Sequence, residues 1–138
     1  MKTLRSLSFA LMFLLGASLG SSPPASANTP DSSLNLFYGL YYQGYASLYA
    51  SQGNPYNAYV YEDAARYSFY LAYIYGTATP SMYAYYAYIY ADAATNYWYL
   101  AYLYGVYTPE LYGYSAALYT ELAQEYGAYA FYLSALGN

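Results

Sequence analysis

Residues 81–104 read SMYAYYAYIYADAATNYWYLAYLY, and this stretch decides the fold class. It runs without glycine or proline, whereas strands average about 5–6 residues and need turns between them. Alanine, which recurs throughout, is the strongest helix former and a poor strand former. Tyrosine favours strands, and residues 85–90 partly alternate, so a β-structure is the competing interpretation. The length and the alanines favour one long helix.

A second copy of the same pattern precedes this stretch. Residues 59–80 (YVYEDAARYSFYLAYIYGTATP) align without gaps on residues 88–109 (YIYADAATNYWYLAYLYGVYTP) at an offset of 29, with 13 of 22 positions identical. Asp63 and Asp92 are equivalent residues within this repeat. Helical repeats bury their apolar faces against neighbouring copies. The repeat therefore predicts helices that pack against one another.

Proline pairs and glycines divide the chain into similar lengths. The pairs are Thr29-Pro30, Asn54-Pro55, Thr79-Pro80 and Thr108-Pro109. Threonine and asparagine are good N-caps, and proline suits the first helical turn. Glycine is common just past a helix end, and the candidates are Gly53, Gly76, Gly105 and Gly137. We predict an all-α fold of four antiparallel helices, as repeat-like hairpins or a bundle with short loops, over roughly 30–52, 55–75, 80–104 and 109–136.

The N-terminus has the organisation of a secretory signal peptide. A basic start at Lys2 and Arg5 precedes an apolar run over residues 7–19, and small residues end at Ala27. The apolar run is too short for a transmembrane helix, which needs ~20 residues. We expect residues 1–27 to be removed and residues 28–138 to form a single Tyr/Ala-rich helical domain. The predicted location is secreted, extracellular or at the cell surface, with no transmembrane span.

Composition restricts the function of the mature chain. All 28 tyrosines and all seven acids follow residue 27, whereas Arg66 is the one base that remains. Nucleic-acid binding depends on lysine and arginine, so we predict none. Cysteine is absent, so packing or assembly must hold the chain together. A buried phenol without a hydrogen bond costs roughly 1–3 kcal/mol, so many tyrosines should lie at the surface, where aromatic patches usually mark an interface.

Side chains on residues 81–104 divide into an alanine face flanked by two aromatic ridges. A face of small residues lets another helix approach closely, and the ridges would interdigitate with that helix. The predicted close-packing face is Ala84, Ala87, Ala91, Ala94 and Ala101. The predicted assembly ridges are Tyr83, Tyr86, Tyr90, Tyr97 and Tyr104 on one side and Tyr85, Tyr88, Tyr99 and Tyr102 on the other, with Trp98 and, in the last segment, Tyr112, Tyr119 and Tyr126.

The last segment also carries leucines that have the pattern of ordinary core. They are Leu111, Leu118, Leu122, Leu133 and Leu136. A tyrosine stripe at helical spacing can likewise be plain core. A plain core, however, prefers residues without a hydroxyl to satisfy. The excess of phenols therefore indicates that the hydroxyls are used.

Groups suited to catalysis are scarce. Histidine and cysteine are absent, and no lysine follows residue 27, so the usual general base, thiol nucleophile and Schiff-base amine are missing. We predict no enzyme activity, no catalytic residue, no metal site and no cofactor.

The carboxylates are assigned structural roles. Glu62 and Arg66 form a favourable i,i+4 pair, expected at a solvated surface. Glu121 and Glu125 are expected on a solvated face as well. The repeat carboxylates Asp63 and Asp92 are surrounded by tyrosines and are expected to accept phenol hydrogen bonds.

We predict a secreted structural protein that self-assembles through tyrosine- and alanine-lined helix faces into an extracellular fibre, sheath or layer. Its partner would be itself, as a homo-oligomer or filament. One alternative is an extracellular module that stacks exposed tyrosines on glycans or other flat ligands. A further alternative is tyrosine-based cross-linking or electron relay.

Overall fold

The computed structural model describes residues 30–106 and 110–136, and all regular structure within them is helical. The helices are α2 (Pro30–Ser51), α3 (Pro55–Tyr75), α4 (Ala78–Tyr104) and α5 (Tyr112–Ala135). The all-α prediction with four helices is confirmed for this part of the chain. The predicted signal peptide lies outside the described residues, as do Thr29, Thr108-Pro109 and Gly137.

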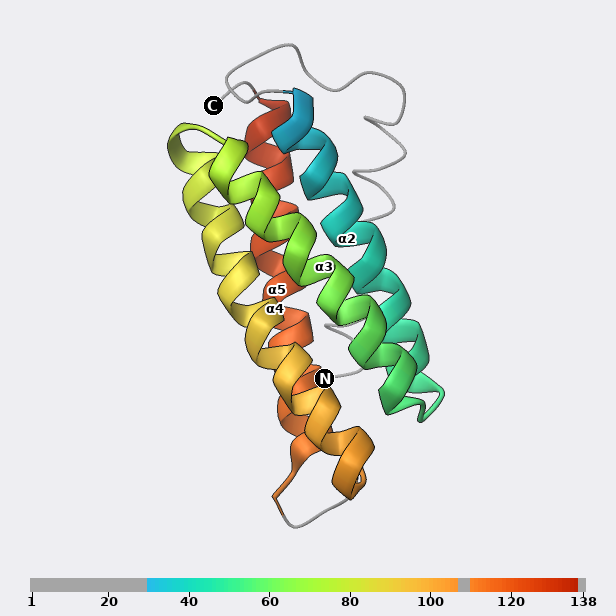
Figure 1. Ribbon diagram of the computed structural model, residues 1–138. Coiled ribbons are helices and arrows are strands. Elements are labelled where there is room, and N and C mark those ends of the chain that lie inside the picture. The colour runs from blue at the N-terminus through green and yellow to red at the C-terminus, as the bar shows by residue number, and fades with distance from the viewer. Residues whose placement is uncertain (1–29, 107–109, 137–138) are drawn as a thin grey trace.

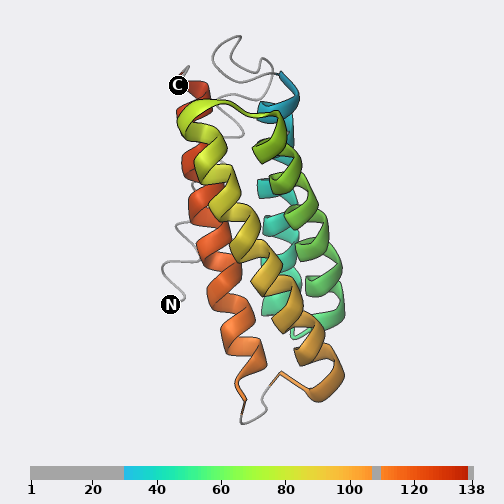
Figure 2. The ribbon, with the colours of Figure 1, turned by 60° about the vertical axis from the view of Figure 1, so that its left-hand side comes forward.

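The four helices form an up-down-up-down bundle, which Figure 1 shows along its length. Each helix packs along the next one in the sequence, and α2 closes the bundle by lying against α5. The turned view in Figure 2 shows α4 between α3 and α5. Short connections favour this arrangement because consecutive helices must fold back on one another.

The start of α3 follows the sequence punctuation. The side chain of Asn54 accepts a hydrogen bond from the backbone N–H of Asn57 at 3.0 Å. Pro55 then occupies the first turn, where its missing N–H costs nothing. Gly53 precedes this cap with a positive φ of 71°, a conformation that other residues rarely adopt.

The starts of α4 and α5 depart from the prediction. α4 begins two residues early, with Thr77 at its N-cap, so that Thr79 and Pro80 lie inside its first turn. α5 begins three residues late, after Leu111, whose φ of 58° is left-handed. Proline tolerance anywhere in the first turn explains why the proline pairs locate helix starts only approximately.

Small residues build the core. All five alanines of the predicted close-packing face of α4 are buried. Phe69 of α3 is fully buried, and its ring occupies a slot between Gly39 of α2 and Gly127 of α5. A Cβ atom on Gly39 would lie 2.4 Å from the ring, and one on Gly127 would lie 2.7 Å from it. The helices therefore approach too closely for larger side chains at these positions.

The leucines of α5 and its caps were expected in the core, and this prediction is wrong. Leu111, Leu118 and Leu136 are exposed, and Leu122 and Leu133 are only half-buried. The inward face of α5 carries small or polar residues instead: Gly113, Ala116, Ala117, Thr120, Glu121, Ala123, Gln124, Gly127, Ala128, Ala130, Phe131 and Ser134. Because these residues bring α5 close to α4, no room remains there for leucine.

The outermost positions of the bundle are apolar. Exposed aliphatic side chains occur on every helix; on α2, α3 and α4 they are Leu34, Leu48, Val60, Ile74, Met82 and Leu103. In most helical bundles such positions carry charged or polar residues. Of the helices within the described ranges, none combines the length and the apolar character that a membrane crossing requires.

Candidate functional site

Tyrosine rings of α4 and α5 alternate along the line where these helices meet. Neighbouring ring centroids lie 5.5 to 6.1 Å apart, and the ring planes are within 20° of parallel. Offset-stacked pairs are worth about 0.5–1.5 kcal/mol each beyond their buried area. This row, here called the α4–α5 ladder, runs Tyr97, Tyr119, Tyr90, Tyr126 and Tyr83.

The remaining tyrosines of this predicted ridge extend the ladder. The ring centroid of Tyr86 lies 5.4 Å from that of Tyr126. At the other end of α4, Tyr104 lies 6.1 Å from Tyr112. The structure therefore brings together, within one molecule, the α4 and α5 tyrosines that the sequence placed on assembly ridges.

The second predicted ridge of α4 pairs with tyrosines of α3. Four pairs cross between the helices, with ring centroids 5.0 to 5.4 Å apart and planes tilted by 46° to 52°. These α3–α4 pairs are Tyr56–Tyr102, Tyr59–Tyr99, Tyr70–Tyr88 and Tyr73–Tyr85.

The internal repeat explains why the four pairs resemble one another. The outer pairs, Tyr56–Tyr102 and Tyr73–Tyr85, lie at the two ends of the row. An offset of 29 residues relates Tyr56 to Tyr85 and Tyr73 to Tyr102, so these two pairs are copies of each other. The inner two pairs are related in the same way. Two antiparallel copies thus create a local pseudo-two-fold axis. The α3 tyrosines were not included in the predicted ridges. The 29-residue offset could have identified them, because it relates them to the ridge tyrosines of α4.

A charged cluster lies between the two inner pairs. Nη2 of Arg66 is 2.8 Å from Oδ1 of Asp63, and its Nε is 3.9 Å from Oδ1 of Asp92. The repeat carboxylates therefore face a guanidinium. The predicted pairing of Arg66 with Glu62 is wrong, because Glu62 points into the core.

The environment of Arg66 favours its charged form. Partial burial opposes that charge, but the hydrogen bonds that Arg66 donates to Asp63 and the charges of Asp63 and Asp92 outweigh it and raise the pKa of Arg66. A groove of about 360 Å³ opens beside the cluster. Its lining is Tyr59, Asp63, Arg66, Asp92, Thr95, Asn96 and Tyr99.

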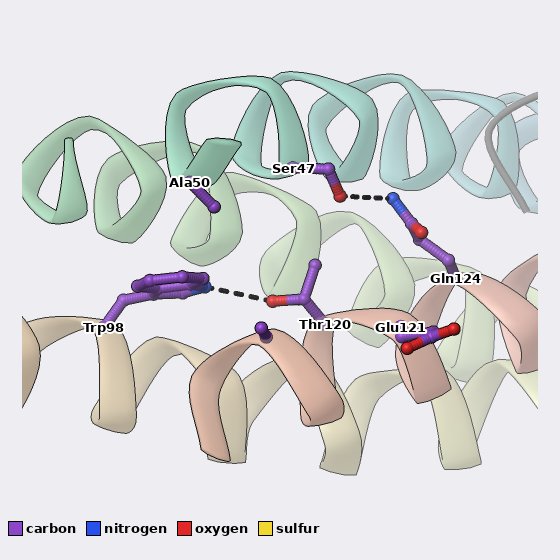
Figure 3. Close-up of a pocket in the computed structure, with 7 residues that line it drawn as sticks. Ser47, Ala50, Trp98, Thr120, Glu121 and Gln124 are labelled. Carbon is purple, nitrogen blue, oxygen red and sulfur yellow. Dashed lines mark hydrogen bonds between the residues drawn. The ribbon is translucent and has the colours of Figure 1, made fainter. Parts of the chain in front are cut away.

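Inside the bundle, all four helices contribute to one polar cluster. Glu62 of α3 accepts hydrogen bonds from Nε2 of Gln43 at 2.5 Å and from Oγ1 of Thr120 at 3.0 Å. Nε1 of Trp98 donates to Thr120 at 3.0 Å, as Figure 3 shows. Trp98 was expected on an aromatic ridge, but it is buried because its N–H finds this partner in the core.

Burial changes the ionisation of Glu62. Removal from water raises the pKa of this carboxyl to about 8, although the hydrogen bonds from Gln43 and Thr120 act in the opposite direction. Glu62 is therefore mainly neutral at pH 7. A neutral carboxyl is tolerated in a core where an unpaired charge would not be.

A cavity of about 10 Å³ adjoins this cluster (Figure 3). Nε2 of Gln124 spans one side of it with a hydrogen bond of 2.8 Å to Oγ of Ser47. Glu121 was predicted on a solvated face, but it is buried, and its Oε1 lacks a hydrogen-bond partner among the described residues. The cavity holds one water at most, so it is too small for a substrate or cofactor.

Comparisons with protein families, with curated proteins and with solved structures found nothing that matches this chain. Within residues 30–106 and 110–136, no three acidic side chains are placed to share a metal ion. The inference of function therefore depends on the surface of the bundle itself.

Proposed function

We propose that the protein is a secreted structural subunit that associates with copies of itself into an extracellular fibre, sheath or layer. The observation that carries this proposal is the apolar outer surface of the bundle. On α3, for example, Val60, Tyr67 and Ile74 form an exposed stripe with a spacing of seven residues. Contiguous apolar surface of this kind usually marks an interface.

Association would use the outer surface rather than the alanine faces. The five alanines of the close-packing face of α4 are already buried within the bundle. The tyrosine rings contact one another along the helix junctions, yet many remain partly exposed. An exposed phenol offers an apolar ring and a hydroxyl together, which suits an interface between like surfaces.

Surface charge offers little opposition to such association. Glu62 and Glu121 are buried, and Asp63 and Asp92 flank Arg66. Repulsion between like net charges normally helps to keep proteins apart in solution. With so few exposed charges, apolar contact between copies dominates.

The proposal is tested by placing charge on the α3 stripe. We expect the unaltered protein to form polymers visible by electron microscopy and to sediment in a concentration-dependent manner. Val60→Glu combined with Ile74→Glu should weaken this association by about tenfold or more, since each tenfold corresponds to about 1.4 kcal/mol. Helix content, measured by circular dichroism, should not change.

The matched control adds two charges at exposed polar positions instead, as Gln52→Glu with Thr79→Glu. This variant should associate like the unaltered protein. A monodisperse monomer at high concentration would rule the proposal out. Equal weakening by both double variants would show that net charge, not the stripe, controls association.

The groove beside Arg66 favours a second candidate, the binding of a glycan. Its volume lies within the range of about 300–1,000 Å³ that is usual for ligand sites. Carboxylates and a guanidinium hydrogen-bond sugar hydroxyls, and the rings of Tyr59 and Tyr99 offer stacking faces. Retention on polysaccharide columns that is lost in Asp92→Asn would support this candidate. No retention on any polysaccharide tested would reject it.

A further inference from the structure

Among the described residues, two of the α3–α4 pairs differ from the other cross-helix ring pairs in having both rings exposed. Both rings of Tyr56–Tyr102 are 49% exposed, and both rings of Tyr73–Tyr85 are 40% exposed. The centroids lie 5.0 and 5.1 Å apart, with ring planes tilted by 52° and 49°. The repeat makes these pairs equivalent, so they occupy opposite ends of the α3–α4 hairpin.

We propose that Tyr56–Tyr102 and Tyr73–Tyr85 are sites of oxidative dityrosine cross-linking within one molecule. The co-reactant is hydrogen peroxide, used by a one-electron oxidant of the haem peroxidase class. This modification goes beyond self-association, because it joins two helices of a single chain. It supplies a covalent link to a chain without cysteine.

The chemistry balances for each pair. Each phenol loses one electron to the oxidant and one proton to water. The two phenoxyl radicals then join through a carbon–carbon bond between ring positions ortho to the hydroxyls, and the hydrogens on those carbons move to the oxygens as aromaticity returns. Two phenols and one hydrogen peroxide thus yield one dityrosine and two water molecules.

Ring distance and access separate these pairs from the α4–α5 ladder. The rings of Tyr97 and Tyr119 have their centroids 5.6 Å apart, and both rings are half-buried. The centroids of the two exposed pairs are closer, at 5.0 and 5.1 Å, which brings the two phenols nearer to coupling distance. Exposure of both partners lets a protein oxidant reach each ring in turn.

The inner α3–α4 pairs meet only part of this requirement. Tyr59 and Tyr88 are half-buried, so one ring of each inner pair is shielded from a large oxidant. Trp98 is buried in the core and is shielded as well. Within the folded molecule, a neighbouring radical is also present at a high effective concentration, which favours intramolecular coupling over coupling between chains.

Cross-links at these positions would hold α3 to α4 at both ends of the hairpin. A covalent link stabilises a fold mainly by restricting the unfolded chain, and the effect grows with the size of the closed loop. Tyr56–Tyr102 closes a larger loop than Tyr73–Tyr85 and should contribute more. The thermal midpoint of the cross-linked monomer should therefore rise.

The test treats dilute protein with a haem peroxidase and limiting hydrogen peroxide, and then isolates the monomer by size. Peptic digestion and mass spectrometry should identify two linked peptides, each lighter by two hydrogens, that join Tyr56 to Tyr102 and Tyr73 to Tyr85. Tyr56→Phe should remove the first link and leave the second. Tyr56→Phe with Tyr73→Phe should reduce dityrosine fluorescence of the monomer to background.

The matched control is Tyr67→Phe with Tyr114→Phe. These rings are 58% and 52% exposed, and neither has a ring neighbour among the described residues. The control should keep the full yield of both links. Links that map to the α4–α5 ladder, dityrosine found only between chains, or equal loss in the control would each overturn the proposal. Phenylalanine keeps the ring, so circular dichroism should show unchanged helix content in every variant.

Discussion

Phe69 shows at the scale of one residue how closely these helices approach. Its ring is fully buried and lies against the backbone of two other helices, at Gly39 and at Gly127. Glycine is required at both positions because any Cβ atom would enter the ring. The burial of the Phe69 side chain therefore requires the absence of a side chain at Gly39 and at Gly127.

Gly39→Ala and Gly127→Ala should each lower the free energy of unfolding by about 1–3 kcal/mol, the usual cost of overpacking a core. Urea unfolding followed by circular dichroism measures this loss. Phe69→Leu in the Gly127→Ala background should recover part of it, since the smaller side chain leaves room for the methyl group. If a double-mutant cycle showed no coupling between these positions, the close contact between the Phe69 ring and residue 127 would be contradicted.

α4 shows at the scale of one element how a helix without a broad polar face is covered. The alanines of its close-packing face are buried in the bundle, one tyrosine ridge stacks on α5, and the other pairs with α3. The seven-residue spacing of Tyr83, Tyr90 and Tyr97 matches that of Tyr112, Tyr119 and Tyr126. Equal spacing lets antiparallel helices alternate their rings over several turns.

Tyr119→Ala should lower the free energy of unfolding by about 2–4 kcal/mol, because the ring lies between Tyr97 and Tyr90 in the ladder. Tyr119→Phe keeps the ring and should change stability by no more than about 0.5 kcal/mol. Urea unfolding of both variants distinguishes ring from hydroxyl. If the two losses were equal, the hydroxyl rather than the stacking would account for the effect.

The buried polar cluster acts at the scale of the whole molecule, because α2, α3, α4 and α5 each supply a member. Glu62 connects Gln43 with Thr120, and Thr120 also accepts from Trp98. The folded protein holds a proton on Glu62 up to a pKa of about 8, whereas the unfolded chain releases it near 4.5. Folding is therefore coupled to proton uptake between these values.

In this window the folded state binds the extra proton, so Glu62 makes stability fall as pH rises. Its contribution is greatest below about pH 4.5, declines by up to ~1.4 kcal/mol per pH unit, and levels off above about pH 8. Glu62→Gln cannot ionise and should remove this decline. Urea unfolding at several pH values measures the difference between the two proteins.

The control is Glu110→Gln, which removes an exposed carboxyl and should keep the pH dependence of the unaltered protein. If Glu62→Gln showed the same decline as the unaltered protein, the carboxyl would not be the source of the effect. At pH 9 the Glu62→Gln variant should be the more stable of the two, because the unaltered core then contains a charge.

The sequence by itself determined the helical class of the described chain and the spacing of the tyrosines along each helix. Long runs of alanine and tyrosine without glycine or proline leave helix as the favoured local structure. The cap at Asn54 depends on neighbours in sequence and was therefore predictable. The seven-residue tyrosine series and the 29-residue offset are also properties of the sequence alone.

Only the tertiary structure decided which face of each helix points inward. Because apolar residues cover nearly every face, hydrophobic periodicity could not distinguish core from surface, and the leucines of α5 were assigned wrongly. Glu62 was equally unpredictable, since Thr120 lies 58 residues away in the sequence. On the inward face of α5, close helix approach admits mostly alanine, glycine and a few polar groups, and it leaves Leu111, Leu118 and Leu136 exposed.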